Sequence, residues 1–118
     1  MYLIVFSCMF IVARPRVSPA LSGEPMILTC SQKPVGPVNW TFHRFSDPKA
    51  EDIVTEGLVV SRHTERFGIT GSSLIIYQVL PSDDGLYECC DSNKDVFAYC
   101  INVIGEEITV ILRTVKCN

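Results

Sequence analysis

The chain has 118 residues, which is enough for one domain, and 47% of them are hydrophobic while 19% are charged. The formal net charge of −3 excludes the basic surface excess that nucleic-acid binding requires. Charges of both signs are interspersed along the sequence, so the composition indicates one globular domain without a nucleic-acid partner.

The first thirteen residues, MYLIVFSCMFIVA, are almost wholly apolar and are followed by Arg14 and Pro15. They are too few to cross a bilayer as a helix. We interpret residues 1–13 as a secretory signal peptide, which predicts a protein that is secreted or lies on the extracellular face of the plasma membrane. Cleavage after Ala20 and a buried first strand are the alternatives. No later run reaches about 18 apolar residues, so no membrane span is expected.

The remaining sequence predicts one domain at residues 14–115 and a short tail at residues 116–118. Short runs of alternating apolar and polar residues are separated by segments rich in Gly, Pro, Ser and Asp, and no segment keeps a helical period. This pattern favours an all-β fold, either an antiparallel sandwich or a barrel. In chain order the runs are PMILTCSQ, PVNWTFHR, SSLIIYQVL, GLYECCD and EEITVILRTV.

The alternation also predicts which residues face the core, because successive side chains of a strand point to opposite faces. Cys89 and Cys90 are neighbours, so Cys89 faces the core together with Tyr87 while Cys90 faces outward. The other inward sets are Met26, Leu28 and Cys30, then Val38, Trp40 and Phe42, and in the last run Ile108, Val110 and Leu112.

An ordered set of motifs runs through these strands. Trp40 lies ten residues after Cys30, and Cys89 ends the segment DDGLYEC, which fits the pattern D-x-G-x-Y-x-C. With the pair RF at residues 66–67, the chain resembles variable-type domains of the immunoglobulin superfamily, as found in immune receptors, over residues 17–115. The resemblance implies a two-sheet antiparallel sandwich that recognises proteins outside the cell. One departure is Glu107, which stands where the family's G-x-G bulge has its second glycine.

The resemblance also implies a core disulfide between Cys30 and Cys89. A bridge that closes so long a loop contributes about 4 kcal/mol in the chain-entropy model. The family further has a tryptophan packed on the bridge, a tyrosine bonded to the backbone and an Arg–Asp ion pair, which here would be Trp40, Tyr87, Arg66 and Asp83.

The remaining cysteines allow more than one pairing. If Cys8 leaves with the signal peptide, five cysteines remain. A simple hairpin centred on residue 95 would place Cys90 opposite Cys100, within range of a disulfide that clamps the loop between them. Alternatively one of the two pairs elsewhere, for example with Cys117. Cys117 itself either links two chains into a disulfide-linked dimer or is an unpaired tail cysteine.

The segment from Cys90 to Cys100 is expected to be a main recognition loop of such a domain. Its Asp95, Phe97 and Tyr99 are the candidate contacts with a protein ligand, because an exposed aromatic side chain on a constrained loop can anchor an interface. The alternative for these residues is that they are strand residues that pack on the sheet.

Asn39, Trp40 and Thr41 form an N-x-[ST] glycosylation sequon, with Asn39 facing outward. A glycan on Asn39 would shield the sheet face that this strand belongs to and would leave recognition to the loops. The alternative is an unmodified site, because a mid-strand sequon beside a core tryptophan folds quickly out of reach.

Signals for catalysis are weak. His43 and His63 are expected to be solvated, the adjacent cysteines lack a second pair at zinc spacing, and no nucleophile or phosphate-loop motif occurs. No enzyme activity, cofactor or metal is therefore expected. The sequence predicts an extracellular protein-recognition module of immune-receptor or adhesion type. The alternative is a soluble decoy or inhibitor, or a truncated secreted immunoglobulin-like protein.

Overall fold

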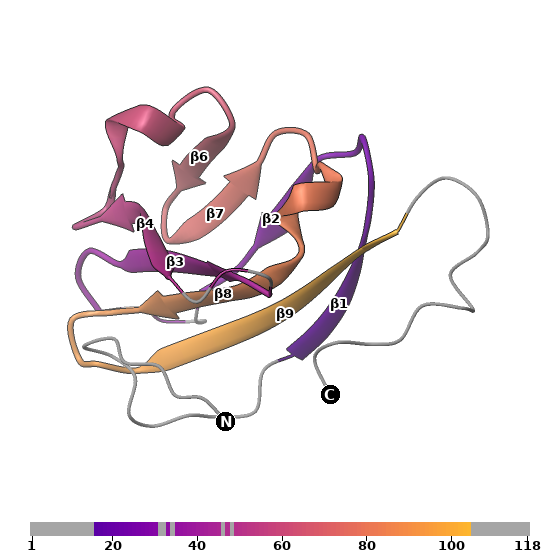
Figure 1. The fold of residues 1–118 in the computed structure, drawn as a ribbon. Helices are drawn as coiled ribbons and strands as arrows, with labels where there is room; N and C mark the ends of the chain where they lie inside the picture. The colour runs from indigo at the N-terminus through magenta and orange to yellow at the C-terminus, as the bar shows by residue number, and fades with distance from the viewer. Residues whose placement is uncertain (1–15, 31–32, 34, 46, 48, 105–118) are drawn as a thin grey trace.

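The computed structural model describes residues 16–30, 33, 35–45, 47 and 49–104. Within them, strands form two sheets that pack face to face (Figure 1). The strands are β1 (Arg16–Leu21), β2 (Met26–Leu28), β3 (Asn39–Arg44), β4 (Ala50–Thr55), β5 (Leu58–Val59), β6 (Phe67–Thr70), β7 (Ser73–Ile76), β8 (Gly85–Cys90) and β9 (Val96–Ile104), with short 3-10 helices η1 (Ser61–His63) and η2 (Pro81–Asp83). The predicted all-β, two-sheet sandwich is confirmed.

The larger sheet has the strand order β1-β9-β8-β3-β4-β5, and the smaller has the order β2-β7-β6. β1 runs parallel to β9, and the other paired strands in the described part of the chain are antiparallel. Strands β4 and β5 extend the sheet beyond β3, with β5 at the edge. These two extra strands distinguish a variable-type sandwich from the seven-strand constant type, so the topology is of variable type.

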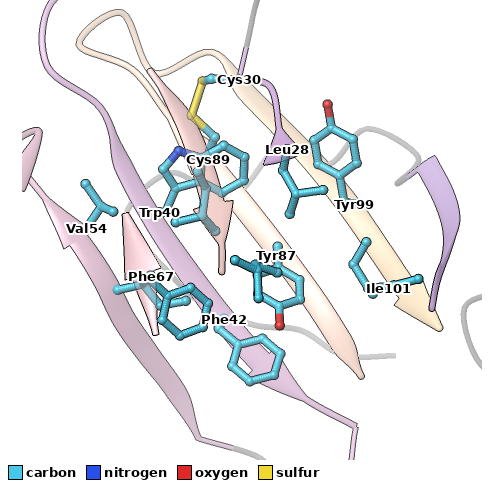
Figure 2. Packing of buried hydrophobic residues seen from close by; sticks show 14 of the residues in the cluster. Leu28, Cys30, Trp40, Phe42, Val54, Phe67, Tyr87, Cys89, Tyr99 and Ile101 are labelled. Carbon is cyan, nitrogen blue, oxygen red and sulfur yellow. A yellow bond between two sulfur atoms is a disulfide. The ribbon is translucent and has the colours of Figure 1, made fainter. Parts of the chain in front are cut away.

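The core lies between the sheets and uses the predicted inward faces. Trp40, Tyr87 and Cys89 have no exposed surface, and Leu28 and Cys30 are almost as deeply buried. The disulfide between Cys30 and Cys89 is confirmed, with 5.6 Å between the two Cα atoms. Trp40 lies directly opposite Cys89 in the β3–β8 ladder, and Figure 2 shows its ring beside the bridge.

Some expectations fall on residues outside the described part of the chain. These are the signal peptide at residues 1–13, the strand run at residues 106–115 and the tail at residues 116–118. β1 begins at Arg16, and Ala20 within it is buried against the core. The residues just before the alternative cleavage point after Ala20 therefore belong to the folded sandwich.

Candidate functional site

Three connections between strands meet at one end of the sandwich. They are residues 33 and 35–38 before β3, residues 56–57 between β4 and β5, and residues 91–95 between β8 and β9. Backbone hydrogen bonds join them, from Ser92 N to Val35 O (2.9 Å) and from Gly57 N to Val38 O (2.9 Å). We call these residues the loop end. In variable-type domains this set of loops forms the recognition surface.

The turn between β8 and β9 is organised by the side chain of Asp91, which is 5% exposed. Its Oδ1 accepts hydrogen bonds from the backbone N–H groups of Asn93 (2.9 Å) and Asp95 (3.1 Å). Its Oδ2 accepts one from Val35 N (3.2 Å), across 56 positions of sequence. Sequence reasoning missed this residue, although an aspartate that opens a turn and bonds the backbone two residues on is a known turn signal.

The two loops pack so closely that one position requires glycine. Gly36 has φ +71°, and a Cβ atom there would overlap the side chain of Ser92. Only glycine adopts such a backbone conformation without a steric penalty. The contact between Gly36 and Ser92 therefore fixes the spacing of the two loops.

Asn39 lies at the start of β3, beside the loop end. Its Oδ1 accepts a hydrogen bond from Glu56 N (2.7 Å), which holds the turn between β4 and β5. Glu56 has φ +51°, an uncommon conformation for a residue with a side chain. An N-linked glycan is carried by the amide nitrogen, so this bond to the oxygen is compatible with glycosylation. Glycosylation of Asn39 stays a prediction.

The predicted opposition of Cys90 and Cys100 is wrong. In the β8–β9 ladder Cys90 lies opposite Val96, and Cys100 lies opposite Leu86. An offset of four positions corresponds to about 13 Å along a strand, whereas bridged cysteines have Cα atoms within about 7 Å. Cys90 and Cys100 are each disulfide-bonded, but a bridge between them does not fit this hairpin. Pairing with Cys117, which lies outside the described residues, stays a prediction.

The extent of the expected recognition loop, from Cys90 to Cys100, is also wrong. Residues 96–104 are strand β9, so the turn is confined to residues 91–95. Tyr99 is not a surface residue: it is 6% exposed, and its hydroxyl donates a hydrogen bond to Thr29 O (2.7 Å). Phe97 is partly buried and packs against the core, which was the alternative for it. Of the three proposed contacts, Asp95 alone is exposed.

The Arg66–Asp83 pair implied by the resemblance is present at the opposite end. Two nitrogens of Arg66 donate to the two oxygens of Asp83, at 3.0 and 2.7 Å. The hydrogen bond with Asp83 raises the pKa of Arg66. The hydroxyl of Tyr87 donates to Asp83 O (2.7 Å), and burial raises the pKa of Tyr87. These contacts stabilise the fold at the end away from the loop end.

The outer face of β8 and β9 offers little open surface. Four side chains that point away from the core are nonetheless buried, with exposed fractions between 2% and 8%. One of them is a carboxylic acid, and burial raises the pKa of Glu88 to about 7. The loop end therefore carries more accessible side chains than this part of the sheet. The four residues are Glu88, Cys90, Ala98 and Cys100.

At the end of the sandwich opposite the loop end, three basic side chains lie around the carboxylate of Glu51. Arg44 lies 3.6 Å, Arg62 3.9 Å and His63 3.0 Å from its carboxylate oxygens. The expectation of a solvated His63 is therefore wrong, since its side chain is 16% exposed and also meets the edge of the Phe67 ring. Among the described residues, no group of three His, Cys, Asp or Glu side chains could hold a metal ion.

Within the described part of the chain, no helix has the length and apolar character that crossing a membrane would take.

Neither the family models nor the curated proteins compared with the chain match it. Among solved structures, 1108 chains match, so the fold is a widely used one. One of them is the extracellular domain of the voltage-gated sodium channel beta4 subunit, with 16% identical residues and a TM-score of 0.59, covering 86% of this chain and 95% of that chain. That domain forms parallel homodimers that explain its role in cell–cell adhesion. At this identity the likeness shows the fold, and the chain has a variable-type immunoglobulin-like fold.

Proposed function

We propose that the chain is an extracellular recognition module of adhesion type, which binds another protein through the loop end. The observation that carries the proposal is the linked arrangement of the loops, in which the turn at residues 91–95 is bonded to Val35 while Asp95 stays exposed. A surface with few internal degrees of freedom loses little entropy on binding. No catalytic activity is part of the proposal.

A second copy of the chain is the partner that we propose to test first. Support comes from the sodium channel beta4 domain, which shares the fold and forms homodimers in adhesion. The loop end also carries both charge signs on exposed side chains, Lys94 and Asp95. Two copies of one surface can therefore meet with opposite charges facing each other.

The experiment uses beads coated with the purified full chain, and the growth of bead aggregates is measured by light scattering. The test variant is Asp95→Lys in the loop end, and the matched control is Glu65→Lys, an exposed acidic residue next to η1. We expect wild-type and Glu65→Lys beads to aggregate and Asp95→Lys beads to aggregate at least about tenfold more slowly.

Two results would contradict the proposal. If wild-type beads do not aggregate, a second copy is not the partner. If Asp95→Lys and Glu65→Lys beads aggregate equally fast, the binding surface lies away from the turn at residues 91–95.

A further inference from the structure

The carboxylate of Asp91 is buried, so its lost hydration has to be replaced by hydrogen bonds from the protein. A charged group removed from water costs free energy unless hydrogen bonds replace its hydration. Here three backbone N–H groups do so, and they come from two different loops: Asn93 and Asp95 from its own turn, and Val35 from the connection before β3. The turn is closed further by bonds from Lys94 N to Asp91 O (3.0 Å) and from Asp91 N to Asp95 O (3.2 Å).

We propose that Asp91 is a positioning residue that couples the connection before β3 to the β8–β9 turn, so that the two loops present their side chains as one unit. The proposal rests on the loop end being the recognition surface. The sequence predicted that a disulfide between Cys90 and Cys100 constrains the loop between them. In the proposal, the side chain of Asp91 constrains it.

The two carboxylate oxygens of Asp91 accept hydrogen bonds from different loops. Oδ1 shapes the turn, because its partners Asn93 and Asp95 both lie within it. Oδ2 holds the turn to the neighbouring loop, because its partner is Val35. A second bond between the same loops, from Ser92 N to Val35 O (2.9 Å), involves only backbone atoms.

A substitution can therefore remove the hydrogen bond to Oδ2 and keep the two hydrogen bonds to Oδ1. In Asp91→Asn the amide oxygen can still accept from Asn93 and Asp95, but the NH₂ group is a donor and faces the N–H donor of Val35. The change is therefore expected to remove the hydrogen bond from Val35 N to the Asp91 side chain and to leave the bonds within the turn. Asp91→Ala removes all three bonds.

Amide hydrogen exchange of the full chain tests the coupling. For Asp91→Asn we expect the exchange of the Val35 amide to accelerate about tenfold or more, with the Asn93 and Asp95 amides within about twofold of wild type. Asp91→Ala is expected to accelerate all three amides. The matched control is Asp95→Asn, the same chemical change on an exposed carboxylate of the same turn, and it should leave the Val35 amide unchanged.

An unchanged Val35 amide in both Asp91→Asn and Asp91→Ala would overturn the coupling, and so would equal acceleration in Asp95→Asn. The bead assay separates this result from the proposed function. If wild-type beads fail to aggregate while the Val35 amide responds, the adhesion proposal fails and the coupling stands. If beads aggregate and Asp91→Asn slows aggregation with unchanged exchange at Val35, the coupling fails alone.

Discussion

Arg66 holds the carboxylate of Asp83 through two hydrogen bonds, and that carboxylate is almost completely buried, with the residue 1% exposed. Asp83 Oδ2 also accepts from Leu80 N (2.7 Å), while Asp83 O accepts from the hydroxyl of Tyr87 (2.7 Å). A single aspartate thus joins the start of β6, the η2 turn and strand β8. This pair lies at the end of the sandwich opposite the loop end, where Glu51 and its three basic neighbours also lie.

Replacing Arg66 should destabilise the domain strongly. In Arg66→Ala the buried carboxylate of Asp83 loses its partner, and we expect the free energy of unfolding to fall by about 2–4 kcal/mol. Urea denaturation measures the change. Arg62→Ala is the control, because Arg62 is exposed and its contact with Glu51 is 3.9 Å long, so a loss below about 0.5 kcal/mol is expected. Equal losses in the two variants would contradict this account of Arg66.

Replacing Tyr99 should lower the stability of the domain, because Tyr99 is a core residue. Tyr99→Ala leaves a cavity beside Trp40, whose ring centroid lies 6.3 Å from that of Tyr99, and should lower the free energy of unfolding by about 3–5 kcal/mol. The control is Tyr77→Ala, a residue that is 51% exposed, and the expected loss is about 1 kcal/mol or less. A wild-type melting temperature for Tyr99→Ala would contradict its burial.

Glu88 should make stability depend on pH. Its pKa in the folded chain, about 7, lies above the ordinary value of 4.5, so the folded chain keeps a proton that the unfolded chain releases between these values. The free energy of unfolding therefore falls as the pH rises through this window, and the loss remains above it. Glu88→Gln cannot ionise, so at about pH 8 it should be more stable than wild type by about 1–3 kcal/mol.

The same comparison of Glu88→Gln with wild type at about pH 4 is the control, since Glu88 is then mostly protonated in both states and the stability of the two proteins should differ little. A stability difference that does not change between the two pH values would show that burial of Glu88 does not favour its neutral form.

Disulfide mapping should find Cys30 linked to Cys89 and should not find Cys90 linked to Cys100. The ladder places Cys90 opposite Val96, too far from Cys100 for a bridge. Mass spectrometry under non-reducing conditions checks this, with fragmentation between the adjacent residues 89 and 90 to separate their partners. A fragment that joins Cys90 to Cys100 would show that the hairpin has another register.

The sequence was sufficient to predict the residues that define the fold. Cys30, Trp40 and Cys89 lie where the resemblance implied, because a period-two pattern fixes the face of each side chain. The same pattern cannot fix the register of a hairpin. A shift by an even number of positions keeps Cys90 and Cys100 on one face while sliding them apart, and the register here is set by the conformation of the turn at residues 91–95.

The loop end could be predicted only in part. Asp95 was named as a candidate ligand contact and is exposed, but Asp91 was missed because its role depends on Val35, which is distant in sequence and near only after folding. Tyr99 was assigned to a loop because β9 was not recognised, although Phe97, Tyr99, Ile101 and Val103 alternate with less apolar neighbours as a strand does. The burial of Glu88 depends on tertiary packing that alternation does not report.

The most direct test of the recognition surface is an NMR titration of the ¹⁵N-labelled chain with unlabelled chain. We expect the largest chemical-shift changes at the amides of Val35, Gly57 and Ser92 in the loop end, with smaller changes at the Arg66–Asp83 end. Shifts concentrated around Arg66 and Asp83, or no concentration-dependent shifts at all, would contradict the proposal that the loop end binds a second copy.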